Sequence, residues 1–260
     1  WLQKRSEPVQ IRFQFFRILE TLSSVTFGAI DLCDIAVHPL RAPDQQSRNC
    51  LLMSDNHRPR RSCLYMPGAN ERALEKAKTL PADTLLLDLE DAVAPEAKET
   101  ARESIRAAVT AGGYGPREVV VRINGLETEW GEADLEMAVT AGANALLAPK
   151  VMDGSDIDRL NEAMARAGAT AEMGLWVMIE MPKAILNIQQ IAEAASRTRL
   201  TTFVMGTNDL AKEYRARMTP DRQAFQTALQ MTVIAARAFG ITAIDGVYND
   251  IRPSTSLISL

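Results

Sequence analysis

Histidine and cysteine are scarce in this chain of 260 residues. The two histidines, His38 and His57, precede the regular part of the sequence, which excludes a serine–histidine triad or a histidine-rich zinc site within that part. The three cysteines are an odd number without CxxC spacing, which argues against a disulfide framework or zinc cluster and is typical of a reducing cytoplasm. Carboxylates, arginines and lysines are therefore left to carry any chemistry.

Long apolar runs and blocks of one charge are also missing. No run approaches the length of a membrane span, so we expect no membrane segment. The net charge is −4 and no stripe of lysine or arginine is present, which disfavours nucleic acid as a partner. Apolar residues make up 47 % of the chain, enough for one α/β barrel or one ordinary domain with appendages.

From Arg61 onward, short apolar segments alternate with helical patterns at a period of roughly thirty residues, which predicts βαβ units and a parallel sheet. The order of these units favours a TIM (β/α)8-type barrel. An open doubly wound sheet is disfavoured because no GxGxxG follows the first strand. The seven predicted strands are residues 62–66, 83–90, 118–124, 145–151, 175–183, 201–210 and 241–247.

The two ends of the chain depart from this pattern. Residues 1–57 lack sustained periodicity and are predicted to be a poorly ordered extension; the alternative is a small helical segment docked on the barrel domain, residues 58–260. Met53 is the expected natural start. The ten residues after Asp250 are too few for another helix, strand and cap, so we expect a barrel truncated after its seventh strand. Such a chain, with open strand edges, is expected to be marginally stable and inactive by itself.

A single carboxylate, Glu180, follows the apolar run LWVMI. A buried carboxylate needs a partner, and a cation is the expected one. The alternatives are a solvated carboxylate or one paired with Lys183. Asp209 ends the next apolar run in the same way. Two buried strands that each end in a carboxylate predict a site for a hard divalent cation.

Polar residues end several other predicted strands, and a barrel gathers such residues in one active site. Any one of them alone is equally well explained as a capping or salt-bridging residue, but their common location predicts a site. The set is Asp88, Glu90 and Asp91 after the second strand, Arg122 and Asn124 on the third, Lys150 on the fourth, Glu180 on the fifth, and Asn208 and Asp209 on the sixth.

All of these residues except Lys150 lie in motifs that resemble the HpcH/HpaI aldolase family, and within it the citrate lyase β subunits and malyl-CoA lyases. The motifs are RSCLYMPG, LLLDLEDAV, VVVRING, the step Glu180–Met181–Pro182, and GTNDL, in this order over residues 60–250. The resemblance implies a TIM barrel that binds Mg2+, with Mn2+ as a second possibility. It also implies CoA-ester and keto-acid substrates, and a homo-oligomer, trimer or hexamer, in which a neighbouring subunit supplies an aspartate for proton transfer.

The resemblance further implies a role for each candidate residue. Glu180 and Asp209 match metal ligands, and Arg122 matches an arginine that holds the keto-acid. The related aldolases have a histidine where this chain has Asp91, and its absence favours the CoA-ester branch. The acidic cluster that orders metal-bound water corresponds to Asp88, Glu90 and Asp91, and the additional residues expected to contact substrate are Asn124, Lys150 and Asn208.

The predicted function is that of a Mg2+-dependent carbon–carbon lyase. It would cleave a 3-hydroxyacyl-CoA of the citryl-, malyl- or citramalyl-CoA type into a keto-acid and an acyl-CoA, with metal and arginine stabilising the developing charge. The enzymatic alternatives are a class II 2-keto-acid aldolase and a CoA-ester thioesterase. The non-enzymatic alternative is a degenerate barrel that serves as a binding module.

Overall fold

The computed structural model describes residues 15–16 and 58–249. The chain divides into two compact units, one of Trp1–Leu19 with Arg60–Leu260 and one of Glu20–Pro59, and nearly all of the second lies outside the described residues. The predicted extension, residues 1–57, therefore stays a prediction apart from Phe15–Phe16. The tail from residue 250 onward also lies outside the described part of the chain.

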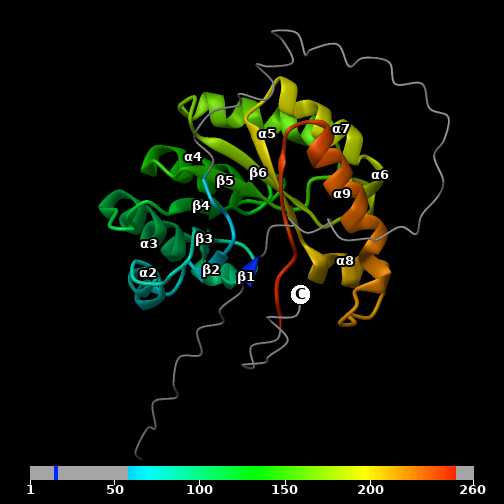
Figure 1. Ribbon diagram of the computed structural model, residues 1–260. Coiled ribbons are helices and arrows are strands. Elements are labelled where there is room, and N and C mark those ends of the chain that lie inside the picture. The colour runs from blue at the N-terminus through cyan, green and yellow to red at the C-terminus, as the bar shows by residue number, and fades with distance from the viewer. Residues whose placement is uncertain (1–14, 17–57, 250–260) are drawn as a thin grey trace, which may run out of the picture. The chain divides into compact units, whose positions relative to one another are not determined.

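One eight-stranded sheet, with its strands in chain order from β1 to β8, forms the centre of the first unit (Figure 1). The short β1 (Phe15–Phe16) pairs antiparallel with β2, and the other seven strands are parallel. The predicted α/β barrel class is confirmed as a seven-strand half-barrel; among the described residues no ladder joins β8 to β2. The parallel strands are β2 Cys63–Pro67, β3 Thr84–Asp88, β4 Glu118–Arg122, β5 Ala145–Ala148, β6 Gly174–Ile179, β7 Leu200–Met205 and β8 Thr242–Ile244.

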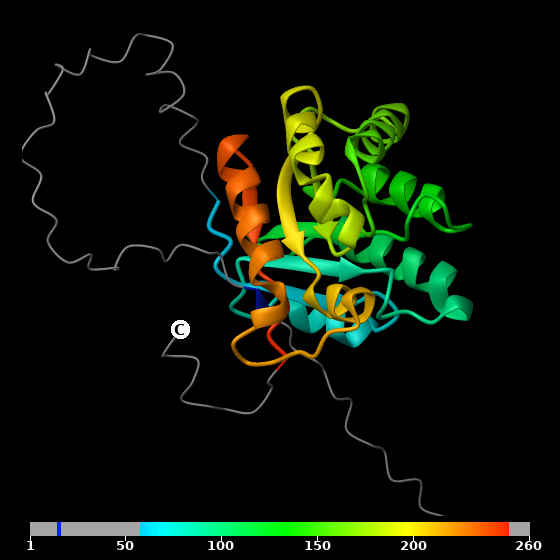
Figure 2. The ribbon, with the colours of Figure 1, turned by 90° about the vertical axis from the view of Figure 1, so that its right-hand side faces the viewer.

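Helices connect the parallel strands and surround the outer face of the curved sheet (Figure 2). In the described part of the chain, none is long and apolar enough to cross a membrane. The α-helices are α2 Glu71–Ala77, α3 Lys98–Ala111, α4 Gly131–Ala141, α5 Gly154–Arg166, α6 Pro182–Leu186, α7 Ile188–Glu193, α8 Thr207–Tyr214 and α9 Gln226–Ala238, with 3-10 turns at Pro95–Ala97, Ala194–Ser196 and Gln223–Phe225.

The two faces of the sheet bury different clusters because successive strand residues point to opposite sides. Leu85 and Leu87 belong to the large cluster between sheet and helices. Leu86 belongs to a smaller cluster with residues such as Val120 and Trp176 on the inner face of the half-barrel. Leu85 and Leu87 thus face the helices, whereas Leu86 faces the interior of the half-barrel. Residues that follow the inner cluster at intervals of two therefore also have their side chains on the inner face, at the carboxyl ends of the strands.

The connection after β7 differs from the prediction. The expected strand over residues 201–210 ends at Met205, and α8 begins at Thr207 after Gly206. Asn208 and Asp209 therefore lie in the first turn of a helix, and their placement on a strand was wrong. The apolar run TTFVM forms the strand, whereas TNDLAKEY buries Thr207 and Leu210 on one side of a helix.

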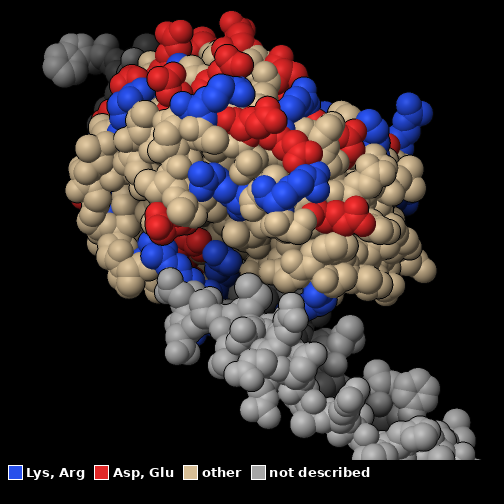
Figure 3. Space-filling view, turned by 90° about the horizontal axis from the view of Figure 1, so that it is seen from above, with Lys and Arg blue, Asp and Glu red and all other residues tan. Residues whose placement is uncertain are grey.

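Charged side chains of both signs are interspersed over the face of the molecule shown in Figure 3. They gather mainly in the upper part of that view, and large areas of the face carry neither sign of charge.

Candidate active site

The charged side chains of the site stand on the inner face, above the apolar cluster that contains Leu86 and Val120. Asp88 is two residues beyond Leu86 and ends β3, and Arg122 is two residues beyond Val120 and ends β4. The ladder between β3 and β4 places Asp88 directly opposite Arg122. The period of two that buries the leucine and valine thus brings an acid and a base together at the carboxyl ends of the strands.

The guanidinium of Arg122 is buried and bonded along one edge to Asp88. Its Nε donates to Asp88 Oδ1 at 2.7 Å and its Nη2 donates to Asp88 Oδ2 at 2.6 Å. The ring of Tyr65 lies beneath it, 5.0 Å from the guanidinium carbon. Burial alone would lower the pKa of Arg122, but the charge and hydrogen bonds of Asp88 outweigh it and raise that pKa, so the group is permanently charged.

Both oxygens of Asp88 also accept hydrogen bonds from the segment that follows it. The amides of Glu90 and Ala92 donate to them at 2.9 and 3.2 Å. Asp88 therefore orients the arginine and closes the turn after β3. Its predicted part in ordering metal-bound water stays a prediction.

Glu90 and Asp91 face the other edge of the guanidinium. Arg122 Nη1 lies 2.8 Å from Glu90 Oε2 and 3.5 Å from Asp91 Oδ2. Glu90 is buried, whereas the side chain of Asp91 is 59 % exposed. Burial raises the pKa of Glu90 against the opposing effects of Arg122 and Lys150. The site thus holds one buried and one accessible carboxylate beside the same cation.

Lys150 connects this acidic segment to Glu180. Its Nζ donates to Glu90 Oε1 at 2.7 Å, and its backbone amide donates to Glu180 Oε1 at 2.8 Å. The residue has a φ of 54°, in the left-handed region that a lysine rarely adopts. Burial would lower the pKa of Lys150, but its bond to Glu90 raises it. One residue thus fixes a carboxylate through its side chain and another through its backbone.

Glu180 is fully buried between β6 and α6, where Pro182 opens the helix. Its Oε2 has no hydrogen-bond partner. Lys183 pairs with Asp153, so the alternative in which Lys183 neutralises Glu180 does not hold. Burial, with the charges of Glu90 and Asp209, raises the pKa of Glu180 to about 8.

A glycine makes room for this carboxylate. A Cβ at Gly206 would lie 2.4 Å from Glu180 Cβ and 2.5 Å from Glu180 Oε2, closer than real Cβ atoms approach. Gly206 stands at the end of β7, immediately before the helix that carries Asp209. The position is thus filled by the glutamate itself.

The residues present fit a hard cation at Glu180 and Asp209. Glu180 Oε2 is buried without a hydrogen-bond partner, and the charge of Asp209 helps to raise the pKa of Glu180. A bound cation would supply the missing partner and offset the repulsion between the two carboxylates. Among the described residues no group of three or more acidic, histidine or cysteine ligands gathers. Mg2+ usually keeps several waters and needs only one or two protein carboxylates, so this pair is sufficient.

The remaining predicted contacts, Asn208 and Asn124, differ in accessibility. Asn208 is exposed and accepts a hydrogen bond from Asn249 Nδ2 at 2.9 Å. Asn124 is buried, and its Nδ2 donates to Leu89 O and to Asp134 Oδ2 at 3.0 and 2.6 Å. Its Oδ1 accepts from the ammonium of Lys98 at 2.7 Å. Asn124 thus stands in a buried polar network below the site, and its predicted substrate contact stays a prediction.

Sequence reasoning missed two members of this network, Lys98 and Asp134. Asp134 is fully buried on α4 and accepts a hydrogen bond from Arg102 Nε at 2.7 Å. Lys98 is buried at the start of α3. The signal for Lys98 was its phase, because it shares the buried face of α3 with Ala101 and Ile105.

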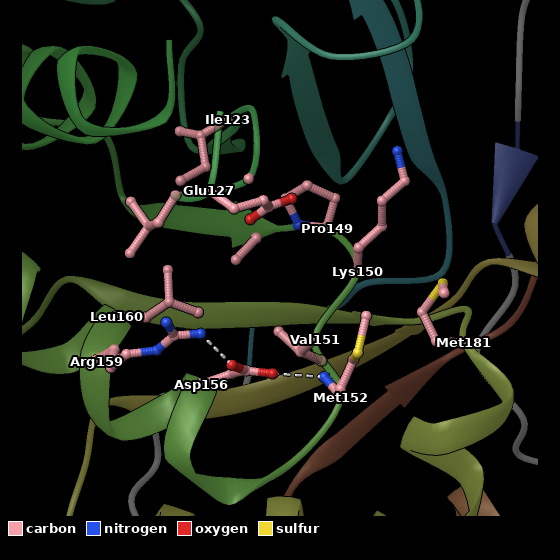
Figure 4. Close-up of a pocket in the computed structure, with 13 residues that line it drawn as sticks. Ile123, Glu127, Pro149, Lys150, Val151, Met152, Asp156, Arg159, Leu160 and Met181 are labelled. Carbon is pink, nitrogen blue, oxygen red and sulfur yellow. Dashed lines mark hydrogen bonds and ion pairs between the residues drawn. The ribbon is translucent and has the colours of Figure 1, made fainter. Parts of the chain in front are cut away.

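Two cavities open beside these groups and share Gly125, Glu127 and Lys150 as lining residues. The first, the acidic cavity, has a volume of about 330 Å3 and is lined also by Glu90 and Asp91. The second, the outer cavity, has a volume of about 260 Å3 and is mainly apolar. Figure 4 shows Arg159 bonded to Asp156 at one side of the outer cavity, with the Lys150 side chain directed away from it.

Comparison with known proteins identifies sequence relatives over most of the chain. The profile of the family described as HpcH/HpaI aldolase/citrate lyase matches residues 61–259. A (3S)-malyl-CoA thioesterase of Cereibacter sphaeroides is 46 % identical over 205 residues, which are 79 % of this chain and 69 % of that protein. The citrate lyase subunit beta of Escherichia coli is 36 % identical over 200 residues, covering 74 % of this chain and 65 % of the relative.

Solved structures with the same fold include proteins of related sequence. The citrate lyase beta subunit of Mycobacterium tuberculosis, complexed with oxaloacetate and magnesium, superposes with a TM-score of 0.60 at 26 % identity, covering 73 % of this chain and 79 % of the other. A structure of the M. tuberculosis protein with magnesium, acetoacetate and coenzyme A has the same TM-score and identity over 72 % of this chain and 65 % of that one.

Proposed function

Because this chain belongs to the HpcH/HpaI aldolase/citrate lyase family, we propose that it is a Mg2+-dependent carbon–carbon lyase acting on a 3-hydroxyacyl-CoA. The substrate is of the malyl-, citramalyl- or citryl-CoA type, and the products are a keto-acid and an acyl-CoA. The observation that carries this proposal is the buried Glu180 carboxylate, with its unpartnered Oε2, in the same charged site as Arg122. The magnesium in the related M. tuberculosis structures supports it.

Glu180 and Asp209 would hold the cation. Mg2+ bound there would act as a Lewis acid that polarises a substrate oxygen. Lys150 fixes one oxygen of Glu180 through its amide, which leaves Oε2 as the oxygen available to a ligand. Gly206 permits Glu180 to take this position.

Arg122 would bind the carboxylate of the keto-acid portion. Its Nε–Nη2 edge is occupied by Asp88, so the substrate would meet the opposite edge, where its carboxylate would compete with Glu90 and Asp91 for Nη1. Glu90 and Asp91 lie at that edge, and Asp91 is the accessible one. A permanently charged guanidinium, held by Asp88, suits negative charge that develops on the substrate during carbon–carbon cleavage. Lys150 and Asn208 would contact the rest of the substrate.

Thioester hydrolysis is the second candidate activity. The relatives from C. sphaeroides that support it are named (3S)-malyl-CoA thioesterases and reach 46 % identity. Hydrolysis releases free CoA and leaves the acyl carbon skeleton intact, whereas the lyase releases a keto-acid and keeps the thioester. The two reactions are therefore distinguished by their products.

The test measures keto-acid and free thiol separately after incubation of the chain with malyl-, citramalyl- and citryl-CoA, in Mg2+, in Mn2+ and in chelator. The corresponding free acids serve as substrate controls, and Glu180→Gln is the matched variant. Binding of glyoxylate, pyruvate and oxaloacetate is followed by calorimetry with and without Mg2+. Keto-acid formed from a CoA ester, but not from the free acid, supports the proposal.

Formation of free thiol without keto-acid would show that the activity is that of a thioesterase and not of a lyase. Cleavage of the free acids would show that it is that of an aldolase. If the chain shows no turnover and no Mg2+-dependent binding of a keto-acid, the metal assignment is overturned. The hypothesis of a binding module then remains. Homo-oligomer formation stays a prediction that sedimentation velocity would measure.

A further inference from the structure

Lys98 makes more buried hydrogen bonds than packing of α3 requires. Its Nζ donates to Leu89 O at 2.7 Å, to Glu90 O at 2.8 Å and to Asn124 Oδ1 at 2.7 Å. An ammonium has three protons, so these bonds account for all of them. The ring of Trp130 lies 5.4 Å from the same nitrogen. Each of the three N–H donors of this buried cation therefore has an acceptor. Two of the acceptors are the backbone carbonyl oxygens of the consecutive residues Leu89 and Glu90.

The backbone held by Lys98 carries Glu90 and Asp91. From the inner side, Leu89 N donates to Arg122 O at 2.9 Å, and the amides of Glu90 and Ala92 donate to Asp88. The carbonyl oxygens of the same stretch, those of Leu89 and Glu90, accept hydrogen bonds from Lys98 Nζ. Residues 89–92, which we call the acidic segment, are thus fixed through amides on one side and through carbonyls on the other.

We propose that Lys98 is a positioning residue that fixes the acidic segment and thereby sets where Glu90 and Asp91 stand against Arg122. An apolar residue at the start of α3 would avoid the cost of burying an ammonium. Without Lys98, the Asn124 amide oxygen would remain buried without a donor. Leu89 O and Glu90 O would keep only their bonds from Asn124 Nδ2 and Val93 N, so the segment would be held less firmly. The catalytic residues are those that touch substrate; Lys98 acts through them.

The opposite end of β4 supplies a matched control. Arg60 is a largely buried cation that donates to both oxygens of Glu118 at 2.6 and 2.8 Å, at the start of β4. Its hydrogen bonds go to Glu118 and Thr242, and none joins it to the acidic segment, which follows β3 at the other end of the sheet. Removing either cation destabilises the fold, but only the loss of Lys98 removes hydrogen bonds from residues 89–92.

The first experiment is amide hydrogen exchange in the full chain, compared for the wild type, Lys98→Met and Arg60→Met. In Lys98→Met we expect the amides of Glu90 and Ala92 to exchange at least about tenfold faster, while those of Val120 and Val121 stay protected. In Arg60→Met the amides of the acidic segment keep their wild-type rates. Equal acceleration in both variants, or none in Lys98→Met, overturns the proposal. This readout does not require the proposed lyase activity.

The second experiment rests on the proposed function and uses turnover. Lys98→Ala leaves space beside the acidic cavity, which Lys98 lines. We expect a lower kcat with little change in KM, a shifted pH profile, and at least about threefold recovery by ethylammonium but not by tetramethylammonium, since only the former can donate hydrogen bonds. Loss of activity without recovery, together with unchanged exchange at residues 89–92, assigns Lys98 a purely structural role. If the wild-type chain is inactive, as expected for this chain by itself, the exchange result alone decides the role of Lys98.

Discussion

Asp88 and Arg122 are direct partners in the β3–β4 ladder and also form a two-bond ion pair with distances of 2.7 and 2.6 Å. Backbone register and side-chain charge thus specify the same geometry. Since β3 and β4 bury apolar residues on both faces, a shift of register by one residue would place the arginine among the leucines and valines of the outer cluster. The pair therefore fixes the orientation of the guanidinium before any substrate arrives.

This geometry predicts that Arg122→Lys is far from conservative. Lysine keeps the charge but cannot donate in parallel to Asp88 while presenting further donors to a substrate. We expect kcat/KM to fall by at least about tenfold, equivalent to about 1.4 kcal/mol of transition-state stabilisation. Steady-state kinetics on the preferred CoA ester measures this loss. A lysine variant with wild-type kinetics would restrict Arg122 to a structural part.

The carboxylates of Glu180 and Asp209 are expected to bind Mg2+ together. Glu180→Gln removes the charge with little change in shape, and Asp209→Asn does the same at the start of α8. Mg2+ should raise the melting temperature of the wild type and have little effect on either variant, because linkage requires binding to the folded state. The exposed Glu162→Gln is the matched control. If Glu180→Gln kept the full Mg2+ response, the metal would lie elsewhere.

The stability of the metal-free protein should depend on pH through Glu180. Its pKa is raised from 4.5 to about 8 by burial and by the charges of Glu90 and Asp209. The folded state therefore favours the neutral carboxyl, and its contribution to stability is fully present below pH 4.5 and lost as the pH rises through about 8.

Denaturant unfolding in chelator, at intervals from pH 5 to pH 9, would reveal this decline. Glu180→Gln, which cannot ionise, should flatten it, and Mg2+ should oppose it by stabilising the carboxylate. A wild type and a glutamine variant with parallel pH profiles would show that another group is responsible.

Gly206→Ala should disturb the metal site specifically. The added Cβ would meet Glu180 at 2.4–2.5 Å, so the carboxylate must move. We expect the Mg2+-induced rise in melting temperature to be lost. Gly142→Ala is the matched control, because Gly142 has a φ of 82° with no atom within 4 Å of an added Cβ. That change should cost about 1 kcal/mol of stability from backbone strain and leave the Mg2+ response intact.

The sequence predicted the parts of this site that follow from periodicity. Asp88 and Arg122 share the phase of Leu86 and Val120, so an alternating pattern was enough to place them on the inner face. Asp209 could not be assigned to a helix in the same way, because the strand ends only at Met205 and a single glycine separates the two elements. The charge of Glu180 was anticipated as needing a cation, but its bond from the Lys150 amide depends on the backbone turn after β5.

Helical phase could place Lys98 on the buried face of α3, but the partners of Lys98 and Asn124 could not be predicted from the local sequence. A lysine near the start of an amphipathic helix is usually a solvated residue, and an asparagine after a strand is usually a turn or site residue. Here both are buried, because the carbonyl oxygens of Leu89 and Glu90 and the carboxylate of Asp134 turn toward them. Those partners come from two separate segments, the turn after β3 and α4, so their convergence is a property of the tertiary structure.

The charged groups of the site belong to successive βα units. Some of them lie at strand ends and others in the connections, and the two kinds of position differ in how much sequence change they tolerate. Asp88 and Arg122 are the last residues of their strands and are tied to the ladder, whereas Glu90, Lys150 and Asp209 stand in the connections that follow β3, β5 and β7. An altered connection can therefore change one chemical role without displacing the arginine. Divergence toward new acyl groups, in nature or by laboratory selection, would proceed through these connections while the strand ends stay the same.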